Sequence, residues 1–171
     1  MAFDLAIDRT AVTKAAGAEN RAATGLVPHG IPDAGETEDD FRTTGGTLCA
    51  IDEESLGERQ DKAREELTFA GYYSNAMFPP IELLYVSGTE NDAVAALLQQ
   101  TWSSVLSVNV MLHGVTQAEY ESRMEEGNYE LALKKVTALY DDAMSFLDRW
   151  CSEDEQNLIG YENGTYDVLL G

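Results

Sequence analysis

Four side chains have types that could support metal binding or acid–base chemistry, namely the adjacent Asp141 and Asp142 and the two histidines, His29 and His113. Neighbouring residues on an extended chain point in opposite directions, so the two aspartates do not readily share one ion. Two histidines without a regular spacing do not specify a metal either. We therefore predict no metal site. We interpret the aspartates as a polar turn before a helix N-terminus, where acidic residues are favoured.

The common catalytic and cofactor motifs are absent from the sequence: there is no GxxxxGK[ST], GxSxG, HExxH or GxGxxG. The sequence thus predicts neither a cofactor nor an enzyme of these classes. One catalytic alternative stays open, a small free-standing α/β enzyme in which Asp141 or Asp142 acts with His113.

The elements that would position these residues follow a regular order. Three apolar runs with strand character, 81–86, 108–115 and 129–136, alternate with helical patterns that begin at Thr89 and Thr116. Strand–helix–strand repeats with short links predict parallel pairing and right-handed crossovers, hence an α/β layered domain with a mainly parallel sheet. Ligands gather at the carboxyl ends of such strands, which here are Ser87–Thr89, His113–Thr116 and Thr137–Asp142.

The remaining segments complete one domain. Residues 2–16 have the spacing of a helix that ends at Gly17, and residues 17–50 are a long loop of the kind that is functional or clamped onto another surface. Further helices are predicted after a cap at Asp52, after a cap at Ser145, and over 165–170.

Charge and composition exclude several classes of protein. The 171 residues carry 31 acidic against 11 basic side chains, a formal charge of −20, which disfavours binding to nucleic acid or to anionic lipid. No segment has the ~20 apolar residues that a membrane-spanning helix needs. Asp4 and Asp8 interrupt the N-terminus, which is therefore no signal peptide, so the cytoplasm is the default location. Cys49 and Cys151 could form one disulfide or remain free thiols.

Several longer segments, taken in order, resemble the C-terminal lobe of family 5 of the extracellular solute-binding proteins, which serve oligopeptide, dipeptide and nickel ABC importers. The segments that carry the resemblance are LAIDR, ATGLVPHGI, DFR, KAREELTFAGY, FPPIELLYV, EYESRMEEGNYELAL, YDDAMSFLDRW and NLIGYENGTYDVLL. In the last of these, the family's residues recur as Asn157, Gly160-Tyr161, Asn163 and Tyr166-Asp167.

The resemblance implies that residues 1–171 are a single α/β lobe of a bilobed, hinge-closing receptor with a periplasmic-binding-protein type II fold. It implies an extracytoplasmic location, membrane-tethered or periplasmic, for the full-length protein. It also implies no catalysis and no cofactor. The expected partners are a peptide or another small solute and, through the full-length protein, the ABC permease subunits.

The resemblance also identifies a candidate site, the segment Val136–Asp142, called the elbow below. In the family, a Trp-x-Ala-Asp-Tyr elbow lines the cleft, and its aspartate pairs with the amino terminus of a bound peptide. Here Val136 stands at the tryptophan position, Ala138 and Tyr140 match, and Leu139 replaces the aspartate. The expected ligand-binding residues are Val136, Thr137, Ala138, Leu139, Tyr140, Asp141, Asp142 and His113.

Overall fold

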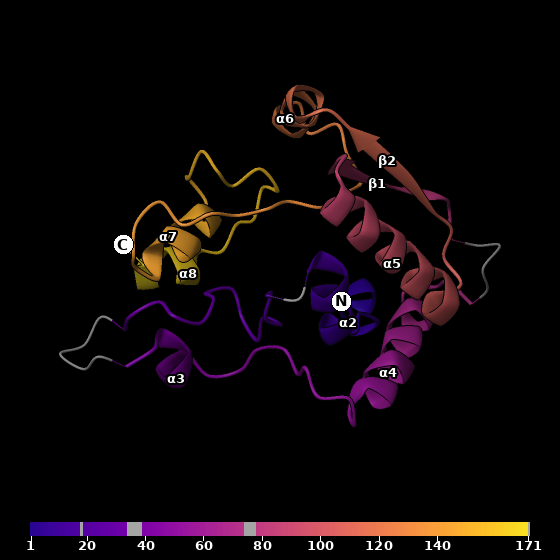
Figure 1. Ribbon diagram of the computed structural model, residues 1–171, viewed down its shortest axis with the longest axis horizontal. Helices are drawn as coiled ribbons and strands as arrows, with labels where there is room; N and C mark the ends of the chain where they lie inside the picture. Colours follow the sequence, from indigo (N-terminus) through magenta and orange to yellow (C-terminus); the bar gives the residue numbers. More distant parts are fainter. Residues whose placement is uncertain (18, 34–38, 74–77, 171) are drawn as a thin grey trace. The chain divides into compact units, whose positions relative to one another are not determined.

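The computed structural model describes residues 1–17, 19–33, 39–73 and 78–170. The chain divides into two compact units (Figure 1). Unit 1 combines Met1–Ala22 with Ile51–Lys134, and unit 2 combines Ala23–Ala50 with Lys135–Gly171.

Unit 1 contains a three-stranded sheet in the order β2-β1-β3, formed by β1 (Ile81–Val86), β2 (Val110–Val115) and β3 (Leu131–Ala132). Both neighbours of β1 run parallel to it, with Leu84 opposite His113 on one side and Ala132 on the other. This confirms the predicted α/β class and parallel pairing.

The predicted third strand over 129–136 is wrong in length, because only its middle pairs with β1. The Leu133 N–H still donates to the carbonyl of Leu84 at 2.9 Å. Beyond this bond, the exposed Lys134 and Lys135 mark the passage from unit 1 into unit 2. Val136, the last residue of the predicted strand, packs against a different core, that of unit 2.

Two helices connect the strands: α5 (Thr89–Leu106) leads from β1 to β2, and α6 (Gln117–Glu125) follows β2. The cap predicted at Thr116 is confirmed, since its Oγ1 accepts the N–H of Glu119 at 3.3 Å. The cap predicted at Thr89 is wrong. Thr89 is already helical, and the N-cap is Gly88, whose N–H donates to Asp92 at 3.3 Å.

The main core of unit 1 lies where α5 covers one face of the sheet, with α1 (Ala2–Leu5), α2 (Arg9–Ala16) and α4 (Leu56–Phe69) packed around it. The single helix predicted over 2–16 is wrong, because the Asp8 carboxylate accepts the N–H groups of Thr10 and Ala11 and so begins a second helix. Trp102 is a core residue whose Nε1 donates to the carbonyl of Phe3 at 2.8 Å.

The helix predicted after Asp52 is confirmed as α4, but the cap predicted at Asp52 is wrong. Its N-cap is Ser55, whose N–H donates to Asp52 Oδ1 at 2.7 Å. The helix ends at Phe69 with Ala70 as its C-cap, and the positive φ of Gly71 (+95°) takes the chain out of the helical path.

Unit 2 has little regular structure: α3 (Phe41–Gly45), α7 (Met144–Leu147), the 3-10 turn η1 (Asp148–Trp150) and α8 (Gly164–Leu170). A small core joins its two chain segments, with members Val27, Ile31, Ala143 and Phe146. The long loop predicted over 17–50 is therefore clamped by Val27 and Ile31, although it also contains α3. Cys49 and Cys151 are free, partly buried thiols.

The C-terminal helix predicted over 165–170 is confirmed as α8. Asn163 caps it, because its Oδ1 accepts the N–H groups of Thr165 at 3.1 Å and Tyr166 at 3.2 Å. The Tyr166 hydroxyl donates to the carbonyl of Leu147 at 2.8 Å, and burial raises its pKa to about 12. Asn163 and Tyr166, two of the residues that carried the resemblance, thus begin α8 and bond it to the end of α7.

Candidate ligand-binding site

Over the first four residues of the elbow, the side chains alternate between the core of unit 2 and solvent. Val136 and Ala138 pack against the small core. Thr137 and Leu139 are exposed, and the Leu139 side chain reaches 74% of full exposure. An apolar side chain this open contributes little to the core of the described fold.

Three hydrogen bonds close the elbow into a turn against the helix that follows it. The Leu139 N–H donates to Ser145 Oγ at 2.7 Å, and the Tyr140 hydroxyl donates to Asp148 Oδ2 at 3.0 Å. The Asp142 carboxylate accepts the N–H of Met144 at 2.7 Å. The elbow is thus held by its own C-terminal neighbours.

The predicted cap at Ser145 is wrong, because Ser145 lies within α7 and is 5% exposed. Asp142 provides the side-chain acceptor at the start of this helix instead. This bond confirms our interpretation of the aspartates as a polar turn before a helix for Asp142. Asp141 is exposed beside it.

The Tyr140 hydroxyl is partly exposed, and its pKa is raised. The main cause is the hydrogen bond it donates to Asp148, with burial and the charges of Asp148 and Asp142 adding to it. Tyr140 therefore stays neutral and acts as a donor over the physiological pH range.

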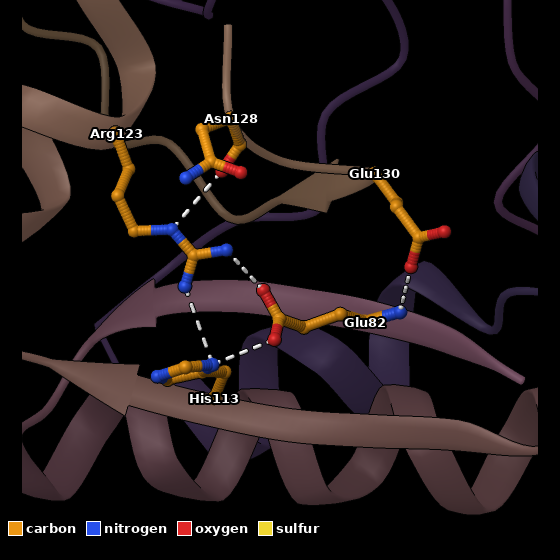
Figure 2. Close-up of polar contacts among 5 residues, drawn as sticks. All are labelled: Glu82, His113, Arg123, Asn128 and Glu130. Carbon is orange, nitrogen blue, oxygen red and sulfur yellow. Dashed lines mark hydrogen bonds and ion pairs between the residues drawn. The ribbon is translucent and has the colours of Figure 1, made fainter. Parts of the chain in front are cut away.

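His113, the other candidate residue, belongs to a cluster of charged side chains in unit 1 (Figure 2). Its Nδ1 lies 2.6 Å from Glu82 Oε2 and 3.2 Å from Arg123 Nη1. Arg123 also donates to the second oxygen of Glu82 and, through Nε, to the carbonyl of Asn128 at 3.0 Å. One ring nitrogen cannot both donate to Glu82 and accept from Arg123, and the carboxylate favours a proton on Nδ1.

The cluster lies on the sheet face opposite the main core. Ile81, Leu83 and Tyr85 on β1 belong to the main core, so the alternation of the strand turns Glu82 to the other face. The hydrogen bond to His113 is the largest cause that lowers the pKa of Glu82, and Arg123 adds to it against the opposing effect of burial. Sequence reasoning missed Glu82 and Arg123, although an acid inside the apolar run IELLYV was a usable signal.

The elbow and His113 belong to different units. Their predicted meeting at one edge of the sheet therefore stays a prediction, and so does the catalytic alternative that pairs His113 with Asp141 or Asp142. Within the described ranges, no three His, Cys, Asp or Glu side chains are grouped as a metal would require. Nor does any helix in those ranges have the length and apolar character to cross a membrane.

The curated proteins that are similar in sequence to the chain include YgiS and DppE. The probable deoxycholate-binding periplasmic protein YgiS of Escherichia coli K12 is 31% identical over 116 residues, which are 67% of this chain and 21% of that protein. The dipeptide-binding protein DppE of Bacillus subtilis is 24% identical over 172 residues, which cover 99% of this chain and 30% of that protein. The chain thus spans less than a third of the length of either relative.

Solved structures agree with this similarity. The structure of Listeria monocytogenes OppA bound to peptide superposes with a TM-score of 0.82 at 20% identity, covering 99% of this chain and 32% of that one. At this identity the likeness shows the fold. The family described as bacterial extracellular solute-binding proteins, family 5, middle part, matches residues 1–157. The chain therefore belongs to family 5 of the bacterial extracellular solute-binding proteins.

Proposed function

We propose that this chain is the ligand-binding lobe of the extracytoplasmic receptor of an ABC importer, and that the receptor binds oligopeptides. The family match over residues 1–157 carries the proposal. In this proposal the lobe is part of a longer protein, the full-length receptor, and the coverage of only 21% to 30% of its curated relatives supports this. Its role is binding without catalysis, and its macromolecular partner is the permease.

The elbow supports a ligand contact in this lobe. It presents an exposed apolar side chain, Leu139, whose backbone N–H is hydrogen-bonded to Ser145, and the neighbouring Tyr140 hydroxyl is bonded to Asp148. Ligand sites combine such apolar contacts with a few fixed polar groups. A backbone that is ordered before binding also reduces the entropy lost on association.

Relatives suggest two ligand chemistries. DppE and the peptide-bound OppA structure favour peptides. YgiS favours a second candidate, an amphipathic steroid acid such as deoxycholate, and the exposed Leu139 would suit the apolar face of such a ligand.

The test is calorimetry of the full-length receptor against dialanine, trialanine, pentaalanine and deoxycholate. We expect saturable one-to-one binding of at least one peptide and a rise in melting temperature that follows its affinity. Binding of deoxycholate alone would replace the peptide proposal with the second candidate. No binding of any compound, by a receptor that melts cooperatively, would contradict both.

A further inference from the structure

We infer that Ser145 is a positioning residue of the ligand-binding elbow: its buried hydroxyl fixes the backbone at Leu139 so that the Leu139 side chain is presented outward. The inference rests on the proposed function of the elbow and adds a residue that makes no contact with ligand itself. It gives a role to a buried polar side chain that lies next in sequence to Phe146, a member of the core of unit 2.

The first observation is the bond itself. Ser145 is 5% exposed, yet it lies between Met144 and Phe146, the latter a member of the small core. Its Oγ accepts the Leu139 N–H at 2.7 Å across six residues of chain. A buried hydroxyl is unfavourable unless it is hydrogen-bonded, so this bond compensates for placing a serine there.

The second observation is that the backbone carbonyl of Ser145 also accepts a hydrogen bond. The Arg149 guanidinium donates through Nη2 to the Ser145 carbonyl at 2.7 Å. Arg149 is 9% exposed, its Nε has no partner, and no carboxylate among the described residues forms an ion pair with it. A guanidinium stays charged when it is buried. Burial of Arg149 without a carboxylate partner therefore costs free energy of folding.

Together these contacts form a chain of hydrogen bonds from a buried cation to an exposed turn. Arg149 fixes the Ser145 backbone, and Ser145 fixes Leu139. Tyr140 adds a second tie through Asp148. Leu139, with 74% of its side chain exposed, is thereby held outward on a defined backbone.

The experiment compares Ser145→Ala, Ser145→Cys and Ser145→Thr in the full-length receptor. Ser152→Ala is the control, because Ser152 belongs to the same unit and its hydroxyl donates to Asp167 at 2.7 Å rather than bonding to the elbow. Amide hydrogen exchange of the proteolytic fragment that contains Leu139 reports the backbone directly, and melting temperatures report stability.

We expect the Leu139 amide to exchange about tenfold faster in Ser145→Ala, because it loses its acceptor. Ser145→Cys keeps the side-chain volume but offers only a weak acceptor, so it carries the same expectation if the alanine variant fails to fold. Ser145→Thr should restore slow exchange. Ser152→Ala should lower the melting temperature while leaving exchange at Leu139 unchanged.

Affinity for each compound of the calorimetric panel that the wild-type receptor binds should fall about tenfold in Ser145→Ala and recover in Ser145→Thr. Unchanged exchange at Leu139 in both Ser145→Ala and Ser145→Cys overturns the inference, and so does faster exchange without loss of affinity. A wild-type receptor that binds nothing contradicts the proposed function instead, and exchange at Leu139 then decides by itself whether Ser145 fixes the elbow.

Discussion

Leu139 is the residue at which the elbow departs from the pattern of the family. The resemblance to family 5 puts a ligand-pairing aspartate at this position, and the structure places the leucine side chain in solvent, clear of the core of unit 2. A polar replacement is therefore compatible with the fold, since it buries no charge and empties no cavity.

We predict that Leu139→Asp in the full-length receptor increases the preference for trialanine over N-acetyl-trialanine. A hydrogen bond to a charged group contributes roughly 1.5–3 kcal/mol, so the preference should increase by about ten- to a hundredfold. Calorimetry with both peptides measures it. Leu139→Asn is the control, because it has nearly the same shape without the charge. Equal preferences in the two variants, both stably folded, would show that the elbow does not receive the amino terminus.

Glu82 is the second residue with a distinct physical role, because it joins two strands and α6 through His113 and Arg123. Its pKa lies below the ordinary value of 4.5. A carboxyl whose pKa is lower in the folded state stabilises that state at pH values above its unfolded pKa. The contribution is lost as the pH falls through the folded pKa.

We predict that Glu82→Gln lowers the free energy of unfolding by about 1 kcal/mol at pH 7, the scale of a partly exposed hydrogen-bonded pair. The difference from wild type should shrink as the pH falls below 4.5, the ordinary value for a glutamate. Urea melts between pH 3 and pH 7, a range suited to carboxyl titration, measure it. Glu121→Gln on the exposed face of α6 is the control. A difference that is independent of pH would argue against this role for the carboxylate.

At the scale of elements, local sequence patterns predicted the helices and strands that have a clear apolar periodicity within one segment. They located β1, α5, β2 and α6, and the parallel order followed from their alternation. They failed where a single side-chain hydrogen bond decides where a helix begins. Asp8 ends a helical spacing that continues through it, and Asp142 rather than Ser145 provides the acceptor at the start of α7, because Ser145 is already engaged with Leu139. The bonds between Glu82, His113 and Arg123 depend on strand register, which no single segment contains.

α8 offers a test at this scale, because two bonds to one side chain begin it. We predict that Asn163→Ala destabilises the protein by about 1 kcal/mol, the usual cost of losing an N-cap. Asn163→Asp retains the acceptor oxygen and should stay close to wild type. Thermal or urea melts compare the two variants. Equal losses in both would instead point to the bond that the Asn163 amide donates to the Tyr161 hydroxyl at 3.1 Å.

At the scale of the whole molecule, the chain spans less than a third of the length of its curated relatives. We predict that the isolated chain binds the peptides of the panel weakly or not at all, because a receptor that closes between two lobes draws on contacts from both. Calorimetry with the isolated chain at high peptide concentration checks this, with the full-length receptor as the positive control. Submicromolar binding by the isolated chain would contradict it.

Each unit is assembled from two separate stretches of chain, and this has a consequence for the order of events during synthesis. Val27 and Ile31 reach the ribosome exit long before Ala143 and Phe146, the residues that cover them. At roughly 5–20 residues per second, the wait is on the order of ten seconds. During that interval, the sheet of unit 1 can be completed up to β3 while the aliphatic side chains of Val27 and Ile31 in unit 2 remain uncovered. A chaperone that recognises short apolar segments would find its target there.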